Sequence, residues 1–267
     1  MNDKNTANNK NTAADLATSL FDAYSKGAIA PLRDQVDPTD ISLAYQIQQE
    51  NHRRWSEQGK VTIGRKIGLT STAVQAQLGV DQPDYGMVYA DTCYCSGAQL
   101  SVGQFLQPKI EAEIAFVLRS DLDADHLTII DVINAVDYAV AALEIVDSRV
   151  ANWDISLFDT IADNASYGGI IMGTTPVPLS QLDLESCKMQ LANSNAVVSE
   201  GEGRACLGNP LLATLWLANR MIENGQPLKA GDVVLSGALG PMVAVKSGDQ
   251  FTASIDGLNS VSVSFID

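Results

Sequence analysis

The sequence predicts an α+β protein with a helical N-terminal region followed by a mixed β-domain. Two long amphipathic stretches occupy residues 13–26 and 40–58, and the last third of the chain carries short strand-like segments divided by Gly- and Asp-rich turns. Helices grouped before strands favour an α+β fold over a doubly wound sheet, in which the two alternate throughout. We expect residues 1–12 to form a disordered tail, residues 13–60 the helical region and residues 61–267 the β-domain.

Local signals set the ends of the expected elements. Glycine readily adopts a left-handed conformation, so Gly27 is expected to end the first helix and Gly59 the second. Ser71 is placed to cap a short helix that closes before Gly79. We expect strands over residues 61–69, 109–118, 138–146, 168–173, 232–236, 242–246, 250–255 and 260–266, a hairpin over 189–199, and helices that open at residues 128, 156 and 209.

The composition excludes several classes of function. The 267 residues include 32 acidic and 17 basic side chains, for a net charge of −15. Without a basic stripe to offset it, this charge argues against a nucleic-acid partner or an anionic membrane. No apolar run is long enough to span a bilayer, and the polar N-terminus predicts no signal peptide.

Cysteine and histidine usage limits the metal chemistry. Cys93 and Cys95 are separated by one residue, which is the wrong spacing for a zinc or redox CxxC motif. The two histidines, His52 and His126, are too few for a typical zinc site. We therefore expect reduced thiols, and carboxylates as the ligands of any bound metal.

The predicted strand over residues 109–118 carries two acids. Strand side chains alternate between faces, so Glu111 and Glu113 point the same way and are followed on that face by Ala115 and Val117. Covered carboxylates repel each other and lose hydration, unless one is protonated or a cation such as Mg²⁺ binds between them. Taken alone, the pattern is more often that of a solvated strand.

A third acid joins this pair. Glu144 lies near the end of the apolar strand over residues 138–146, where an unpartnered carboxylate is out of place. An ion pair with Arg149 is the ordinary explanation. The alternative is a metal site in which Glu111, Glu113 and Glu144 supply oxygen ligands and leave other positions for water and a chelating substrate.

Lys66 lies inside the otherwise apolar strand over residues 61–69. A partly desolvated lysine near a bound cation tends towards a lowered pKa, as proton transfer requires. A surface lysine whose stem lies along apolar neighbours is an equally consistent interpretation.

At these residues the chain resembles the fumarylacetoacetate hydrolase superfamily, and within it the hydratase and decarboxylase branch, closest to the bacterial hydratases of 2-hydroxypenta-2,4-dienoate. The resemblance runs in family order and covers nearly everything after the first dozen residues. The matching stretches are residues 30–34, 64–70, 79–86, 108–115, 142–146, 162–166 and 237–242.

The resemblance implies a mixed β-sandwich or roll around a divalent cation, Mg²⁺ or Mn²⁺. It implies Glu111, Glu113 and Glu144 as metal ligands and residues 61–267 as the catalytic domain. Such enzymes act in the cytoplasm, are usually homo-oligomers, and associate with other enzymes of their pathway, such as an aldolase or a decarboxylase. Further roles are implied for Lys66 and Asp84 in proton transfer and for Thr70, Asn164, Ser166 and Leu239 in binding the substrate or water.

The implied reaction is hydration of 2-hydroxypenta-2,4-dienoate to 4-hydroxy-2-oxopentanoate in the meta-cleavage breakdown of aromatic compounds. The apolar segment at residues 237–242, which includes Leu239, favours a substrate with a small uncharged tail. Decarboxylation of 4-oxalocrotonate and hydrolysis of an acylpyruvate are alternatives on the same fold. A non-catalytic subunit that stabilises a partner enzyme is a fourth, although such a subunit has no need to bury three carboxylates.

Overall fold

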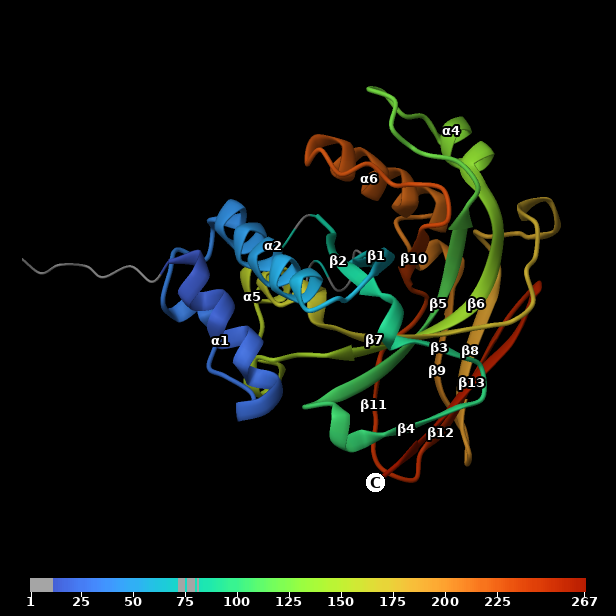
Figure 1. Ribbon diagram of the computed structural model, residues 1–267. Coiled ribbons are helices and arrows are strands. Elements are labelled where there is room, and N and C mark those ends of the chain that lie inside the picture. Colours follow the sequence, from blue (N-terminus) through green and yellow to red (C-terminus); the bar gives the residue numbers. More distant parts are fainter. Residues whose placement is uncertain (1–11, 72–74, 76–79, 81) are drawn as a thin grey trace, which may run out of the picture.

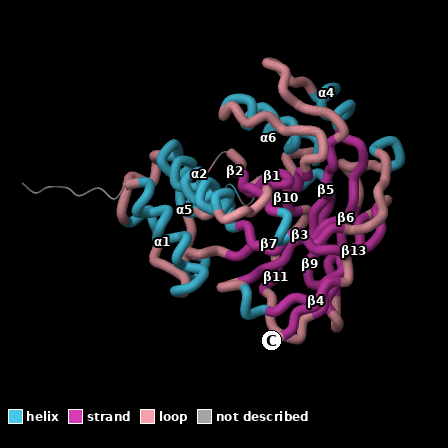
Figure 2. Tube along the Cα trace, in the orientation of Figure 1, coloured by secondary structure: helices cyan, strands magenta, loops and turns pink. Residues whose placement is uncertain are grey.

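Two β-sheets and a group of N-terminal helices make up the protein in a computed structural model, which describes residues 12–71, 75, 80 and 82–267 (Figure 1). Figure 2 separates the helical side of the molecule from the strand-rich side. The helices are α1 (Ala13–Lys26), α2 (Ile41–Glu57), α4 (Ile129–Ala135), α5 (Leu157–Ala162) and α6 (Pro210–Glu223). The strands are β1 (Thr62–Gly68), β2 (Asp84–Tyr89), β3 (Cys93–Cys95), β4 (Ala98–Ser101), β5 (Pro108–Leu118), β6 (Val136–Asp147), β7 (Tyr167–Met172), β8 (Lys188–Asn193), β9 (Val197–Glu202), β10 (Val233–Ala238), β11 (Val243–Ala244), β12 (Gln250–Ile255) and β13 (Leu258–Ile266).

The larger sheet has the strand order β2-β1-β10-β5-β6-β7-β3, with β11 paired to the end of β5. The smaller sheet has the order β4-β13-β12-β8-β9. Both sheets are mixed, because β1 runs parallel to β10 and β4 parallel to β13 while most other pairs are antiparallel. The sheets pack against each other through β6 and β13, and the apolar core lies between them.

The N-terminal helices have a core of their own. Leu16 and Leu20 of α1, Ile47 of α2, and Phe158 and Ile161 of α5 pack together out of contact with water. Figure 1 shows these three helices on one side of the larger sheet, next to β1, β2 and β7. The segment from α5 into β7 therefore joins the helical group to the sheet.

The structure confirms the α+β class, the helical N-terminal region and the mixed sheets. α1 has the expected bounds. Thr12 caps its N-terminus through a capping box and so is not part of the tail. The rest of the expected tail and most of the short helix after Ser71 lie outside the described residues. Strands β2, β3 and β4 were not expected. In the part of the chain that the structure describes, no helix is long and apolar enough to cross a membrane.

A glycine in β1 sets how closely the strand that carries Lys66 approaches its neighbour. A Cβ atom built on Gly64 would lie 1.9 Å from the carbonyl oxygen of Val233 on β10. We expect Gly64→Ala to lower the free energy of unfolding by about 1–3 kcal/mol, because the two backbones must separate. Urea unfolding measures this. Gly103→Ala, whose Cβ would lie 3.4 Å from the Ser101 hydroxyl, is the control; an equal loss in both variants would contradict the prediction.

Candidate metal and proton-transfer site

The register of β5 against β6 brings the three glutamates together. Glu111 lies directly opposite Glu144 across the antiparallel pair, and Glu113 follows two residues along on the same face. One carboxylate oxygen from each lies within 4.8 Å of the others. The structure therefore brings together three acids, of which the first and the last are 33 residues apart in the sequence.

The covered strand face that the sequence analysis assumed is present. Glu113 and Glu144 have no exposed surface, whereas Glu111 is partly exposed. Ala115 is fully buried on the same face. The solvated-strand interpretation is thus wrong for this strand.

Lys66 is the cation that faces these acids. Its ammonium group lies 3.2 Å from Glu144 Oε1 and donates a hydrogen bond to the carbonyl oxygen of Ala165 at 3.0 Å. Only 3% of the residue is exposed, so the surface-lysine interpretation is wrong. The expected ion pair between Glu144 and Arg149 is also wrong, because Arg149 binds Asp163 instead.

Asp84 on β2 approaches the same point as Lys66. A Cβ atom on Gly68 would lie 2.1 Å from Asp84 Oδ1 and 3.5 Å from Lys66 Nζ, so both groups lie over this glycine. Asp84 Oδ2 accepts a hydrogen bond from the Thr160 hydroxyl at 3.0 Å, and Oδ1 is buried without a partner. The free oxygen is available to a substrate or to a proton.

Glu113 is oriented by the backbone of β10. The amide of Gly237 donates to Glu113 Oε2 at 2.9 Å, next to a shift in the pairing of β10 with β5. Gly237 has a φ of +103°, and a Cβ there would lie 2.3 Å from the Thr70 hydroxyl oxygen. Gly237 can therefore bring its amide to Glu113 Oε2. The other oxygen, Glu113 Oε1, has no partner and is free for another ligand. No role was expected for Gly237, although a glycine directly after a predicted strand is a recognisable signal.

The four residues expected to bind substrate lie in different settings. Thr70 packs on Gly237 beside the glutamates, and the Ser166 hydroxyl is buried without a partner. The side-chain amide of Asn164, by contrast, makes two hydrogen bonds to the backbone of Met87. Its Oδ1 accepts from Met87 N at 2.7 Å, and its Nδ2 donates to Met87 O at 3.0 Å. Leu239 is buried in the core and its amide donates to the carbonyl of Ala112.

The electrostatics of the cluster favour protonated acids in the absence of a metal. Burial raises the pKa of Glu144 to about 8. Burial and the negative charges of Glu144 and Glu111 also raise the pKa of Glu113 well above its usual range. Burial alone would lower the pKa of Lys66, but the surrounding carboxylates outweigh it and raise the pKa, opposite to the expected direction.

The residues fit a divalent cation. Glu113 Oε1 and Glu144 Oε2 are buried without partners, Glu144 Oε1 has only the ion pair with Lys66, and the carboxylates repel one another. A hard cation such as Mg²⁺ or Mn²⁺ would satisfy these oxygens and remove the repulsion. It would also offset the negative charge that holds the proton on Lys66.

The fold and the acid cluster point to a family of metal-dependent enzymes. Residues 59–265 match the family model described as fumarylacetoacetate (FAA) hydrolase C-terminal, and the chain belongs to this family. It is 54% identical to 2-keto-4-pentenoate hydratase 1 of Dechloromonas aromatica (strain RCB), over 89% of this chain and 90% of that protein. It is 53% identical to 2-keto-4-pentenoate hydratase of Burkholderia vietnamiensis (strain G4 / LMG 22486), over 96% and 98%.

A solved structure of similar shape holds a cation. 4-Oxalocrotonate decarboxylase from Pseudomonas putida G7, complexed with magnesium and adipate, superposes with a TM-score of 0.91 at 33% identity and covers 95% of this chain and 97% of its own. The expected family and fold are therefore confirmed.

The raised pKa values predict how stability depends on pH without metal. Between pH about 4.5 and 8 the folded protein retains protons that the unfolded chain releases from Glu144, so the free energy of unfolding falls as the pH rises. Mg²⁺ or Mn²⁺ replaces those protons, so its stabilising effect is expected to be larger at pH 8 than at pH 5. At pH 8 it reaches about 2.7 kcal/mol at a hundredfold excess over the dissociation constant.

Thermal unfolding in chelator and in added metal, across this pH range, measures the effect. Glu113→Gln is the control, because its amide oxygen still accepts from Gly237 while one negative charge is removed. Its response to both pH and metal should be weaker. A metal effect that is equal at both pH values, or unchanged in this variant, would contradict the site.

Proposed function

We propose that the protein is a divalent-metal-dependent hydratase that converts 2-hydroxypenta-2,4-dienoate into 4-hydroxy-2-oxopentanoate in the meta-cleavage breakdown of aromatic compounds. The observation that carries this proposal is the identity of about half of all residues, along nearly the whole chain, with proteins named as 2-keto-4-pentenoate hydratases. The buried cluster of three glutamates beside a lysine supports it, because this reaction develops negative charge on an oxygen.

In this proposal Glu111, Glu113 and Glu144 hold Mg²⁺ or Mn²⁺. The bound cation supplies Lewis-acid stabilisation of negative charge on the substrate. The partly exposed edge at Glu111 admits the substrate, and the buried surroundings keep bulk water away from the reacting dienol.

Lys66 and Asp84 move the protons. Conversion of the dienol to the 2-oxo-3-enoate removes the proton of the 2-hydroxyl and adds one at C5, and water then adds at C4, conjugate to the ketone. Lys66 Nζ and the unpartnered Asp84 Oδ1 converge over Gly68, where they can take and return these protons. The free hydroxyl of Ser166 and the side chain of Thr70 are proposed to bind the substrate carboxylate or the water.

Decarboxylation of 4-oxalocrotonate is the second candidate, because the decarboxylase structure is so similar in shape. The segment over residues 237–242 distinguishes the two. It is apolar, and a second carboxylate on the substrate would call for a cation there. We therefore favour the shorter, uncharged tail.

The purified protein with Mg²⁺ or Mn²⁺ is expected to remove the dienol absorbance of 2-hydroxypenta-2,4-dienoate, and a chelator is expected to abolish the activity. Incubation with 4-oxalocrotonate, with release of CO₂ as the readout, is the parallel assay. Release of CO₂ without hydration of the shorter dienoate would replace the hydratase by the decarboxylase. Inactivity of the isolated chain on both substrates would favour the non-catalytic subunit.

Two variants separate the roles in the same assay. Glu111→Gln is expected to lose both metal content and activity, because one charged ligand is removed. Lys66→Met is expected to keep the metal and to lower kcat by roughly 10²–10⁴-fold, as for loss of a proton-transfer group. If Glu111→Gln kept both its metal and its activity, the metal site would be wrong.

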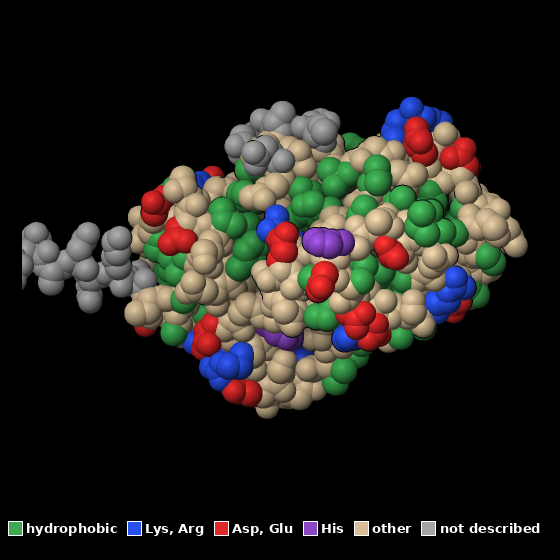
Figure 3. All heavy atoms as spheres, turned by 90° about the horizontal axis from the view of Figure 1, so that it is seen from above, with side chains coloured by type: hydrophobic (Ala, Val, Ile, Leu, Met, Phe, Trp, Pro, Cys, Tyr) green, Lys and Arg blue, Asp and Glu red, His purple; other side chains and the backbone are tan. Residues whose placement is uncertain are grey.

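We also propose that the protein is a cytoplasmic homo-oligomer. All four cysteines are free thiols, which suits a reducing compartment. Ile130 and Ile133 on α4 and Leu212 on α6 are exposed, and the two helices pack against each other. Hydrophobic side chains gather on this face of the molecule, seen from above (Figure 3). We propose that this face contacts a second copy of the chain, and an association with a pathway aldolase or decarboxylase stays a further hypothesis.

Ile130→Asp tests the proposed contact. A charge at the centre of an apolar interface is expected to weaken self-association at least tenfold, measured by analytical ultracentrifugation. Val61→Asp is the matched control, because Val61 is 62% exposed and Ile130 64%. An unchanged oligomer in Ile130→Asp, or an equal effect of Val61→Asp, would rule out this face.

A further inference from the structure

The turn that accepts the hydrogen bond from Lys66 has an unusual backbone. Asn164, Ala165 and Ser166 all have left-handed φ angles, of 54°, 51° and 54°. Three consecutive non-glycine residues in this region do not persist unless their surroundings hold them there. The carbonyl of the middle residue, Ala165, is the one that faces Lys66 Nζ.

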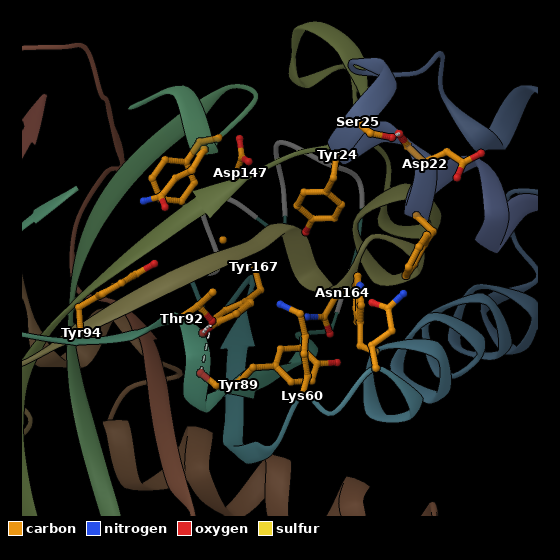
Figure 4. A pocket seen from close by; sticks show the side chains of 16 residues that line it. Asp22, Tyr24, Ser25, Lys60, Tyr89, Thr92, Tyr94, Asp147, Asn164 and Tyr167 are labelled. Atoms are coloured by element: carbon orange, nitrogen blue, oxygen red, sulfur yellow. Dashed lines mark hydrogen bonds between the residues drawn. The ribbon is translucent and has the colours of Figure 1, made fainter. Parts of the chain in front are cut away.

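The turn is buried, but one side of it faces a cavity rather than packed side chains. Asn164 and Tyr167 line a cavity of about 410 Å³ on the side of α1, as do Tyr24 and Asp147. Figure 4 shows these four side chains around the space. A segment with a cavity on one side needs directional bonds to keep a strained conformation.

Arg149 supplies those bonds at both ends of the turn. Its guanidinium group donates to the carbonyl of Asp163 before the turn and, at 2.8 Å, to the carbonyl of Tyr167 after it. It also forms an ion pair with the Asp163 carboxylate, and its backbone amide donates to that carboxylate at 2.9 Å. Both side chains are 1% exposed, so the contacts are shielded from water.

A second clamp fixes the turn against β2. The two hydrogen bonds between the Asn164 side chain and Met87 fasten the first residue of the turn to the strand. Gly86 allows this approach, because a Cβ there would lie 2.3 Å from the Asn164 carbonyl oxygen.

We propose that Arg149 is a positioning residue of the hydratase: with Asp163 it holds the left-handed turn over residues 164–166, which aims the Ala165 carbonyl at Lys66 and thereby fixes the ammonium group beside Glu144. The inference rests on the proposed function. β6 then helps to position Lys66 in two ways. It contains Glu144, which pairs with the ammonium group, and Arg149 follows two residues after its end.

The test is Arg149→Met/Asp163→Asn, in which the Asp163 carboxylate is removed together with its cation, so that this ion pair leaves no unpaired charge. We expect kcat to fall roughly 10- to 100-fold, as for a reactive group displaced by about 1 Å, while the KM and the dissociation constant for Mn²⁺ stay within about threefold. Adding Ala165→Gly should recover part of the lost kcat, because glycine adopts left-handed φ without strain.

Arg33→Met/Asp159→Asn is the matched control. This pair, with 2.8 Å between Arg33 Nη1 and Asp159 Oδ2, ties the same helix α5 to the N-terminal segment without contacting the turn. Its loss should lower stability and leave kcat within about threefold. An equal fall of kcat in the control, or an unchanged kcat in Arg149→Met/Asp163→Asn, would overturn the proposal.

Amide hydrogen exchange tests whether Arg149 holds the turn over residues 164–166, independently of activity. The Ser166 amide bonds to the carbonyl of Asp163 at 3.0 Å, and exchange across residues 163–167 should accelerate at least tenfold in the test variant alone. Unchanged exchange there would overturn the proposal. If the unaltered protein does not hydrate the dienoate, the proposed function fails, and the exchange data still decide whether Arg149 holds the turn.

Discussion

The mutual repulsion of three neighbouring carboxylates, two of them fully buried, is the constraint on which the rest of this site depends. Glu111, Glu113 and Glu144 cannot all stay ionised in a covered sheet face without a cation. Groups on neighbouring strands therefore offset part of their negative charge. The ammonium of Lys66 faces Glu144 and the Gly237 amide faces Glu113. These contacts account for some of the carboxylate oxygens and leave Glu113 Oε1 and Glu144 Oε2 without a partner.

The sheet topology makes this arrangement possible. Lys66 reaches the glutamates across β10, because β10 lies between β1 and β5 in the strand order. At this crossing β10 carries Ser236 and Gly237, whose small size leaves room above the strand. A larger residue at position 237 would meet Thr70 as well as adopt a strained backbone. The approach of Lys66 and Thr70 to the acids therefore depends on small residues in β10.

The sequence predicts most of the individual helices and strands of this site and few of the contacts between distant segments. The two-residue period of a strand was enough to place Glu111 and Glu113 on one face, and capping and glycine signals located α1, α2 and α6. Strand β2 was missed because all six of its residues are buried and show no alternation.

Partners distant in sequence were beyond the reach of pattern analysis. An ion pair with Arg149 was the ordinary interpretation of Glu144, but Asp163, which directly follows α5, is the residue that binds Arg149. The left-handed turn after Asp163 leaves no signal in residues as ordinary as Asn, Ala and Ser. Only the family resemblance drew attention to residues 162–166, and it could not tell a substrate ligand from a structural clamp.

The distribution of unpartnered polar atoms separates these two roles. Nine buried side-chain oxygen or nitrogen atoms in the described residues have no hydrogen-bond partner, and six of them belong to two of the glutamates and to three residues near Lys66 and Gly237. These six belong to Asp84, Glu113, Glu144, Ser166 and Ser236. A buried polar atom left unpaired costs about 1–3 kcal/mol, so water or a ligand is expected to complete these bonds. Asn164, whose amide is fully used by Met87, lies outside this set. Asp84 and the two serines therefore have unpaired polar atoms to offer, whereas the side chain of Asn164 is fully used in fastening the turn to β2.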